Sequence, residues 1–288
     1  MNILLIGSNG YIGSELYKKL LENYNVTGID INWYGTINDS IPMDYKNIDS
    51  SFLKQFDSII LLAGHSSVKM CDGPIQASYK NNVYNFLNLV KNCSKHQVII
   101  YASSGSIYTH NDDNLFLPTN NYDLTKYILD LHSQQFMQER TIIGLRLGTV
   151  NGHSPNLRNE LMINAMVRSA ITQQKITINN VKVRRPILGI NDLTKGINKI
   201  LLKPVTGIYN LCSFNSTVEG IAQDISKKLN VPIQYEIDTS NPYDFYFDNI
   251  NFEQTFDFKF RDSVATIVED LLNNTPIITG DRNNFINY

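Results

Sequence analysis

The amino terminus combines a short apolar run with three evenly spaced glycines, and this feature constrains the fold of the chain most. Residues 3–6 suit a buried strand, and Gly7, Gly10 and Gly13 follow before a helical pattern begins. Gly7 permits a sharp turn, Gly10 leaves the backbone open to a ligand, and Gly13 lets helix and strand pack closely. The first N–H groups of such a helix bind phosphate. The G-x-x-G-x-x-G spacing, one residue different from the commonest dehydrogenase pattern, therefore predicts a dinucleotide-binding turn. Its expected cofactor contacts are Gly7, Asn9, Gly10, Tyr11, Ile12 and Gly13.

A carboxylate after the second apolar run indicates which dinucleotide binds. The run 25–30 ends in Asp30, about twenty residues after the glycines, where an acidic side chain accepts hydrogen bonds from ribose hydroxyls. The same charge repels a 2′-phosphate, and residues 31–34 include no Arg or Lys to bind one. Asp30 therefore favours NAD. The alternative interpretation is a strand that merely ends in a solvated Asp.

Composition and charge exclude several classes of protein. The chain has 288 residues, 42% of them hydrophobic and 18% charged, with a formal net charge of −2, which is typical of a globular protein without a nucleic-acid-binding face. Its apolar runs are too short to span a membrane, and no basic leader precedes the first strand, so we expect a cytoplasmic protein. The three cysteines and five histidines lack ligand spacing, which predicts reduced thiols and no metal.

Strand and helix patterns alternate through the first half of the chain, which predicts an α/β fold. We expect a Rossmann-type doubly wound parallel sheet covered by helices, with a smaller mixed α/β lobe at the C-terminal end. Residues 1–150 would form the NAD-binding domain and 151–288 the substrate-binding lobe, with parts of about 184–212 returning to the sheet. The expected strands are 2–7, 25–30, 40–44, 58–63, 97–103, 141–147, 176–182, 186–190, 207–211 and 233–237. The expected helices are 12–23, 74–95, 121–138, 156–173, 192–203, 216–229 and 262–272.

A Tyr and a Lys four residues apart open the helix that follows the fifth strand. Tyr122 and Lys126 would share one face of that helix, so the ammonium would lower the pKa of the phenol and make it a general base. Ser104, at the end of the preceding strand, would hold the substrate oxygen, with Ser103 and Ser106 as alternatives. The competing interpretation is a surface pair, but no other Tyr of the chain has a Lys four residues later.

Taken in order along the chain, these motifs resemble those of the extended short-chain dehydrogenases/reductases, in the NAD-dependent epimerase/dehydratase family that includes UDP-galactose 4-epimerase. The resemblance covers nearly the whole length. It implies that Ser104, Tyr122 and Lys126 are catalytic, and that Lys126 also binds the nicotinamide ribose. Further cofactor contacts that it implies are Asp44, Leu62, Ala63 and Gly64.

The resemblance also implies a nucleotide-sugar substrate held by the C-terminal lobe. Asn164 and Arg185 match sugar-nucleotide contacts, although each also suits an ordinary surface position. His65 and Ser66 would either touch substrate or cap the next segment. The substrate-binding set is then His65, Ser66, Ser104, Tyr122, Asn164 and Arg185.

Three departures from the family pattern limit the choice of reaction. The dehydratase branch carries an Asp-Glu pair after the catalytic hydroxyl, and Gly105 and Ser106 stand there instead, so a 4,6-dehydratase is not expected. Asn241 replaces a second phosphate-binding Arg, and Asn151 replaces an aromatic residue.

The most consistent function is an NAD-dependent epimerase acting at C4 of a nucleotide sugar through a keto intermediate. Tyr122 would remove the hydroxyl proton while Ser104 steadies the developing carbonyl. An NAD(P)H-dependent 4-keto-sugar nucleotide reductase would use the same residues, and a catalytically silent NAD-binding scaffold is a third alternative. The family resemblance further implies a homodimer built on helices 74–95 and 121–138. Apolar residues at helical spacing would form its interface or belong equally well to the core: Val83, Phe86, Leu87 and Val90 on the first helix, and Leu124, Ile128 and Leu131 on the second.

Overall fold

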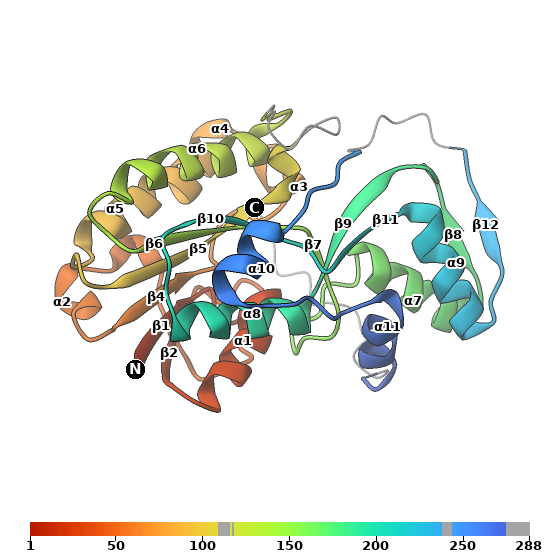
Figure 1. Cartoon of the computed structure of the whole chain (residues 1–288), viewed down its shortest axis with the longest axis horizontal. Helices are drawn as coiled ribbons and strands as arrows, with labels where there is room; N and C mark the ends of the chain where they lie inside the picture. Colours follow the sequence, from red (N-terminus) through yellow and green to blue (C-terminus); the bar gives the residue numbers. More distant parts are fainter. Residues whose placement is uncertain (109–115, 117, 238–243, 275–288) are drawn as a thin grey trace.

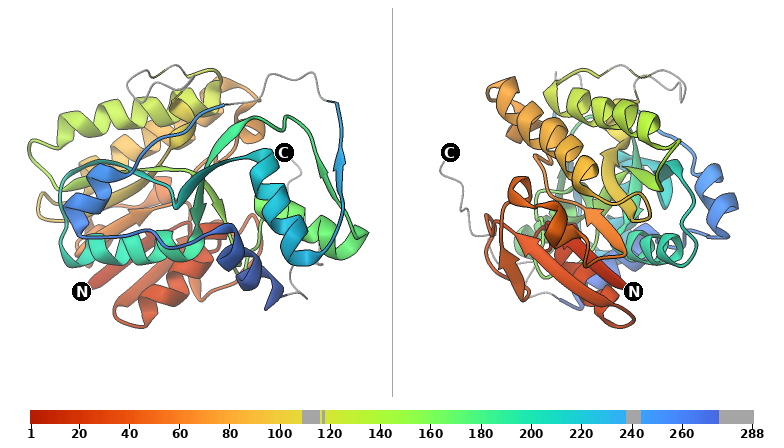
Figure 2. Two further views of the ribbon diagram at one scale, coloured as in Figure 1. Left: turned by 45° about the vertical axis from the view of Figure 1, so that its right-hand side comes forward. Right: turned by 90° about the vertical axis from the view of Figure 1, so that its left-hand side faces the viewer.

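A parallel sheet between two layers of helices forms the larger part of the molecule, and a smaller lobe lies beside it (Figure 1). The computed structural model describes residues 1–108, 116, 118–237 and 244–274. The 90° view in Figure 2 shows helices on both sides of the strands. The predicted doubly wound α/β fold is therefore confirmed.

The main sheet has seven strands in the order β10-β6-β5-β4-β1-β2-β3, and every neighbouring pair is parallel. Strand order reverses direction between β1 and β4, so the crevice above these two strands is where such folds bind ligands. The strands are β1 (Asn2–Ile6), β2 (Asn25–Asp30), β3 (Ser40–Pro42), β4 (Ser58–Leu61), β5 (Val98–Ser104), β6 (Ile142–Leu147) and β10 (Gly207–Leu211).

Alternation along the strands divides the apolar core between the two faces of the sheet. Ile3 and Leu5 belong to a cluster with apolar residues of α1 (Tyr11–Leu21) and α8 (Ile190–Leu202), whereas Leu4 and Ile6 pack with α5 (Asn85–Asn92) and α6 (Asn121–Phe136). Successive side chains of a strand point to opposite faces, so one apolar strand supplies both clusters.

One long predicted helix is divided. Residues 74–95 form α4 (Ile75–Tyr79), a π-helical turn (Lys80–Tyr84) and α5, so the helix carries a wide turn in its middle. Asn82 lies in this turn, and its side-chain amide contacts the His65 backbone and the Thr125 hydroxyl. The turn thereby ties the end of β4 to helix α6.

The smaller lobe is built on two further sheets. Strands β7 (Thr149–Asn151), β9 (Arg184–Gly189) and β11 (Phe214–Thr217) form one, and β8 (Ile176–Ile178) pairs with β12 (Ile233–Tyr235) in the other. Helices α7 (Met162–Gln173), α9 (Val218–Leu229) and α11 (Val264–Leu272) cover them (Figure 1). Residues 190–211 leave this lobe: α8 packs on α1, and β10 extends the main sheet beyond β6.

Several sequence expectations were wrong in detail. The helix expected from 156 begins at Met162, and the strand expected to end at 182 ends at Ile178. The short elements β7, β11 and α10 (Ile250–Phe256) were not predicted. Segments of three to seven residues are too short for their apolar periodicity to be distinguished from loop sequence. The remaining short elements are α2 (Ser50–Leu53), α3 (Val68–Cys71) and two single 3₁₀ turns at Tyr45–Asn47 and Gly105–Ile107.

Candidate active site

A cavity of about 500 Å³ lies at the carboxyl ends of the main-sheet strands and extends to the smaller lobe. The predicted site residues in its wall are Gly7, Gly10, Tyr11, Ile12, Gly13, Asp30, Asp44, Leu62, Ala63, Gly64, Ser66, Ser104, Tyr122 and Lys126. These residues come from six separate segments. The tertiary structure therefore brings the glycine turn and the Tyr-Lys pair to one continuous space.

The glycine turn has the geometry that its residues predict. Gly7 has a φ of +89°, and a Cβ there would lie 2.7 Å from the backbone N of Ala63. A Cβ on Gly13 would lie 1.9 Å from the carbonyl oxygen of Gly7, so α1 approaches β1 too closely for any side chain. Helix α1 starts after Gly10 without a side-chain cap, which leaves its first N–H groups to a ligand.

Asp30 and Asn9 connect the glycine turn to the loop that follows β2. The Asp30 carboxylate accepts the backbone N–H of Asn9 at 2.9 Å and that of Asn32 at 2.8 Å. The Asn9 side chain is buried and accepts the N–H groups of Ile37 and Asn38, so it shapes the loop after β2 without lining the cavity. Each Asp30 oxygen keeps acceptor capacity for ribose hydroxyls.

The Tyr-Lys pair lies on the first turns of α6, opposite the end of β5. Asn120 caps this helix by accepting the N–H of Asp123, which orients the turn that holds Tyr122. Tyr122 forms a hydrogen bond with Ser104, whereas the Lys126 ammonium donates to the Ala102 carbonyl at 2.7 Å. The ammonium lies 5.9 Å from the centre of the Tyr122 ring.

The electrostatics of the pair differ from the sequence expectation. Burial raises the pKa of Tyr122, and the hydrogen bond with Ser104 offsets part of that rise. Burial also lowers the pKa of Lys126 to about 8, with the Asp130 carboxylate opposing the change. Lys126 is therefore not among the main influences on the pKa of the phenol, and its ammonium instead donates to a carbonyl on the neighbouring strand.

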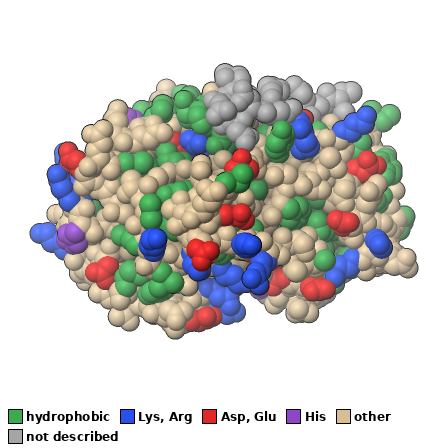
Figure 3. All heavy atoms as spheres, in the orientation of Figure 1, with side chains coloured by type: hydrophobic (Ala, Val, Ile, Leu, Met, Phe, Trp, Pro, Cys, Tyr) green, Lys and Arg blue, Asp and Glu red, His purple; other side chains and the backbone are tan. Residues whose placement is uncertain are grey.

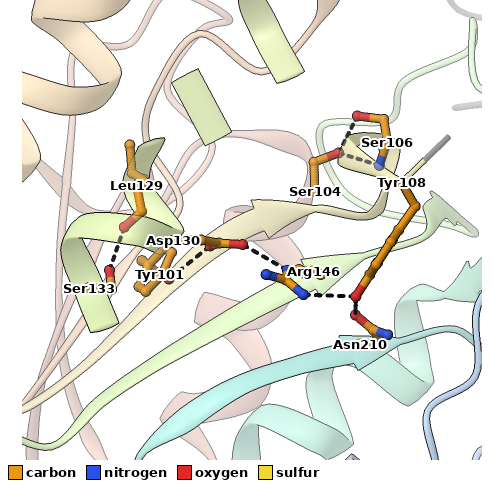
Figure 4. A network of polar contacts seen from close by, with 9 residues as sticks. All are labelled: Tyr101, Ser104, Ser106, Tyr108, Leu129, Asp130, Ser133, Arg146 and Asn210. Atoms are coloured by element: carbon orange, nitrogen blue, oxygen red, sulfur yellow. Dashed lines mark hydrogen bonds and ion pairs between the residues drawn. The ribbon is translucent and has the colours of Figure 1, made fainter. Parts of the chain in front are cut away.

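A buried polar network fastens the segments that carry these groups (Figure 4). Arg146 on β6 donates through Nε to Asp130 at 2.7 Å and through its terminal nitrogen to the Tyr108 hydroxyl at 2.8 Å. Asp130 lies one turn after Lys126 and also accepts from Tyr101, while Tyr108 follows Ser104 by four residues. The network thus links helix α6 to the segment after β5.

Three predicted substrate residues lie outside the cavity wall. Asn164 is buried, accepts the Gly152 N–H and donates to the Arg158 carbonyl, so its amide is used inside the protein. Arg185 donates to the Arg184 carbonyl and lies 5.9 Å from the ring centre of Phe245, which itself lines the cavity.

His65 is the third of these residues, and it is also buried. Its Nδ1 lies 3.0 Å from the Ser78 hydroxyl, and its backbone N–H donates to Asn82, so it joins β4 to the helix carrying the π turn. Burial lowers the pKa of its imidazole, which favours the neutral ring. Asn241 lies outside the described residues.

Of the wall residues that were not predicted as contacts, two bear directly on the chemistry of the site. Arg158 lines the cavity from the smaller lobe, with Nε held at 2.7 Å by Glu160. It lies close enough to Tyr122 for its charge to lower the pKa of that phenol. Ser106, weighed only as an alternative to Ser104, lines the cavity beside it. A lone Arg in a loop carries no spacing signal, so sequence reasoning had no means to find Arg158.

The described residues offer neither a metal-binding cluster nor a membrane-spanning helix. No group of three His, Cys, Asp or Glu side chains in the described residues is arranged to hold a metal ion, and the three cysteines are buried thiols outside any disulfide. Within the same ranges no helix combines the length and apolarity that crossing a bilayer requires. On the face drawn in Figure 3, basic and acidic side chains are interspersed.

An uncapped glycine turn, an acidic residue after β2, and a Tyr-Lys pair opposite a strand-end serine define the site of a short-chain dehydrogenase/reductase of the extended type. The chain belongs to the NAD dependent epimerase/dehydratase family, whose model matches residues 3–212. It is therefore an enzyme of that family.

Relatives and solved structures agree with this assignment. Protein CapI of Staphylococcus aureus is 26% identical over 239 residues, covering 72% of this chain and 71% of CapI. The uncharacterized UDP-glucose epimerase YtcB of Bacillus subtilis is 27% identical over 237 residues, covering 71% and 73%. The UDP-glucuronic acid 4-epimerase of Bacillus cereus, solved with UDP-glucuronic acid and NAD, superposes with a TM-score of 0.84 at 22% identity, over 96% of this chain and all of that one. This structural likeness establishes the fold.

Proposed function

We propose that this chain is an NAD-dependent epimerase that inverts C4 of a nucleotide-activated sugar. The observation that carries the proposal is the meeting of the glycine turn, Ser104, Tyr122 and Lys126 in one cavity. A hydride acceptor must reach one carbon of the substrate while a general base reaches the hydroxyl on that carbon, and this cavity is lined by groups suited to both tasks.

The residues present fit NAD. The phosphates would meet the uncapped start of α1, where Gly10 presents backbone and no side chain. Asp30 would accept the ribose hydroxyls, and Asp44 lies farther along the same wall. When bound, NAD supplies the site that takes and returns a hydride. The NAD-bound UDP-glucuronic acid 4-epimerase of similar fold supports this choice of cofactor.

The chain's own residues account for the proton chemistry. Tyr122, as a phenolate, removes the proton of the C4 hydroxyl while the C4 hydrogen leaves as hydride, which gives a 4-keto sugar. Lys126 supplies positive charge near the phenol once a ribose rather than the Ala102 carbonyl receives its ammonium. The keto sugar then turns, takes hydride on its opposite face, and regains the proton from Tyr122.

The charges of the site and the relatives support a nucleotide sugar as the substrate class. Arg158 places a second cation in the described cavity wall besides Lys126, which suits the phosphate or carboxylate groups of an anionic sugar nucleotide. Epimerases of UDP sugars are among the similar proteins. Gly105 and Ser106 supply no acid-base pair for elimination of water, which disfavours a dehydratase.

We also propose a homodimer formed through α4, α5 and α6. Tyr79, Leu124 and Leu131 are exposed on α4 and α6, and Tyr84 is exposed at the end of the π-helical turn between α4 and α5. Two large aromatic and two aliphatic side chains in water favour a covered surface. The other residues of the expected interface are less accessible. Val83, Phe86 and Val90 are buried within the subunit, and Leu87 and Ile128 are partly buried. Light scattering at micromolar concentration tests the proposal, and a monomeric mass would refute it.

The decisive experiment incubates the purified protein with a panel of nucleotide sugars and their 4-keto forms, including UDP-glucose and UDP-glucuronic acid. An isomer of unchanged mass, formed without added cofactor, supports the epimerase. Incorporation of labelled hydrogen from external nicotinamide cofactor identifies the 4-keto reductase instead. Tyr122→Phe should abolish turnover, whereas Tyr127→Phe, one turn away on the same helix, should retain it. Unchanged biological activity in Tyr122→Phe would favour the silent scaffold.

A further inference from the structure

A segment of the smaller lobe is bonded directly to the glycine turn, and the proposed reaction gives these contacts no role. The segment, residues 152–158, follows β7, which Figure 1 shows where the main sheet meets the smaller lobe. The Tyr11 hydroxyl donates to the Gly152 carbonyl at 2.8 Å, and the Ser154 hydroxyl donates to the Tyr11 carbonyl at 2.6 Å. Both contacts are buried, so the first turn of α1 is fastened to the smaller lobe.

Asn156 makes the contacts of this segment that reach farthest into the expected cofactor region. Its side-chain amide has two protons, and Nδ2 donates to the Asn9 carbonyl at 2.6 Å and to the Tyr34 carbonyl at 3.3 Å. Asn9 belongs to the glycine turn, whereas Tyr34 lies in the loop after β2 and lines the cavity. Asn156 is buried, so one amide of the smaller lobe holds two walls of the expected dinucleotide site.

The other end of the segment carries Arg158, which lines the cavity. Asn164 on α7 accepts the Gly152 N–H at 3.0 Å and donates to the Arg158 carbonyl at 2.9 Å, so one buried amide joins the two ends of the segment. Only the buried Leu157 separates Asn156 from Arg158. A displacement of Asn156 therefore also displaces the backbone of Arg158.

We propose that Asn156 is a positioning residue that makes the binding of cofactor and of nucleotide sugar cooperative. The inference rests on the proposed function for its two ligands and adds a coupling between their sites. Bound dinucleotide orders the glycine turn and the loop after β2, Asn156 transmits that order to residues 152–158, and Arg158 is thereby fixed for the anionic group of the substrate. By linkage, a substrate held by Arg158 tightens the binding of cofactor by the same factor.

Such coupling suits an enzyme that returns the hydride it has taken. An epimerase must keep the keto sugar and the cofactor in one cavity until the hydride is returned, because loss of either one ends the cycle. A 4-keto reductase must release its cofactor in every cycle, so retention of cofactor by the bound nucleotide would slow it. The coupling therefore fits the epimerase better than the reductase.

The test measures the release of NAD from the NAD-loaded protein with and without a saturating nucleoside diphosphate. The probes are UDP, dTDP, GDP and CDP, which carry the anionic group but no reacting sugar, so no turnover is needed. Released NAD is detected by its reduction with alcohol dehydrogenase and ethanol, and calorimetry establishes saturation by the probe in each protein. At least one probe should slow the release of NAD from wild type about tenfold, because differences in affinity lie mostly in the dissociation rate. If no probe slows it, the proposal is overturned.

Asn156→Ala and Asn38→Ala form a matched pair of variants. Asn38 donates through Nδ2 to the Ser8 carbonyl at 2.8 Å, next to the carbonyl that Asn156 uses, but it belongs to the NAD-binding domain. A general loosening of the glycine turn would affect both variants. The slowing by the probe should fall below about twofold in Asn156→Ala and stay about tenfold in Asn38→Ala. Unchanged slowing in Asn156→Ala, which simple blocking of the cavity by the probe would give, overturns the proposal, as does an equal loss in Asn38→Ala.

A third variant, Arg158→Gln, keeps the contacts of Asn156 and removes the charge at the substrate end of the segment. It should also lose the slowing at saturating probe, and slowing of wild-type size would refute the proposal even where Asn156→Ala does not fold. Turnover of nucleotide sugars is measured separately. If wild type converts none of them while Asn156→Ala loses the slowing, only the epimerase proposal fails. If wild type is an active epimerase and Asn156→Ala keeps the slowing, only this inference fails.

Discussion

The buried ion pair between Arg146 and Asp130 should be essential for stability. The free energy of unfolding that is lost when the pair is broken can be estimated from its burial. Their side chains are 10% and 1% exposed, and the pair joins β6 to α6 at 2.7 Å. Breaking a buried pair by removing one partner costs about 3–5 kcal/mol. With 288 residues the entropy of unfolding is about 0.6 kcal/mol/K, so the melting temperature should fall by about 5–8 °C.

The groups around the pair predict which of the two single variants loses more stability. In Arg146→Met, Asp130 remains buried with the Tyr101 hydroxyl as a donor. In Asp130→Leu, the Arg146 guanidinium still lies 4.6 Å from the ring centre of Phe116 and 5.4 Å from that of Tyr108. Cation–π contacts partly compensate a buried cation, so Arg146→Met should be the more destabilised variant.

A double-mutant cycle measured by chemical unfolding provides the assay. The double variant Arg146→Met/Asp130→Leu leaves no buried charge and should recover most of the loss, to within about 2 kcal/mol of wild type. Single losses below about 1 kcal/mol, or a double variant as unstable as the sum of the singles, would show that the pair is not coupled as the geometry requires.

Three further predictions concern the site. Gly13→Ala should weaken NAD binding about tenfold or more by calorimetry, because its Cβ would meet the Gly7 carbonyl oxygen at 1.9 Å; unchanged affinity would contradict the proposed packing of α1. Turnover should decline as the pH rises through about 8, where buried Lys126 loses its proton, and Lys126→Arg should move this decline to higher pH; a decline at the same pH in both proteins would exclude Lys126 as its cause. Because the pKa of Lys126 is lower in the folded than in the unfolded chain, its unfavourable contribution to the free energy of unfolding is full below pH 8 and disappears as the pH rises toward 10.5. Arg158→Gln should raise KM for a nucleotide sugar about tenfold with a smaller change in kcat, and loss of bound NAD at unchanged KM would instead assign Arg158 to the cofactor.

Features that depend on neighbours along the chain were readable before the structure. The glycine turn follows from conformational limits on three residues, and the parallel sheet follows from apolar strands alternating with helical patterns. Tyr122 and Lys126 share a helix face because four residues make about one turn. The family resemblance rested on these local motifs, and the family match confirms it.

Features that depend on contacts between distant segments were decided by the tertiary structure alone. The spacing of Tyr122 and Lys126 does not reveal that the ammonium is directed to Ala102 on another strand, nor that burial raises the pKa of the phenol. Asn164 was predicted as a substrate contact, with a surface amide as the alternative, and only the folded chain brings Gly152 and Arg158 to its side chain. The class of fold and the main chemical groups could be predicted from residues close together in the chain, because backbone conformation and apolar period are local. Packing decided which hydrogen bonds and charges those groups meet, because partners far apart in the chain come together only in the folded protein.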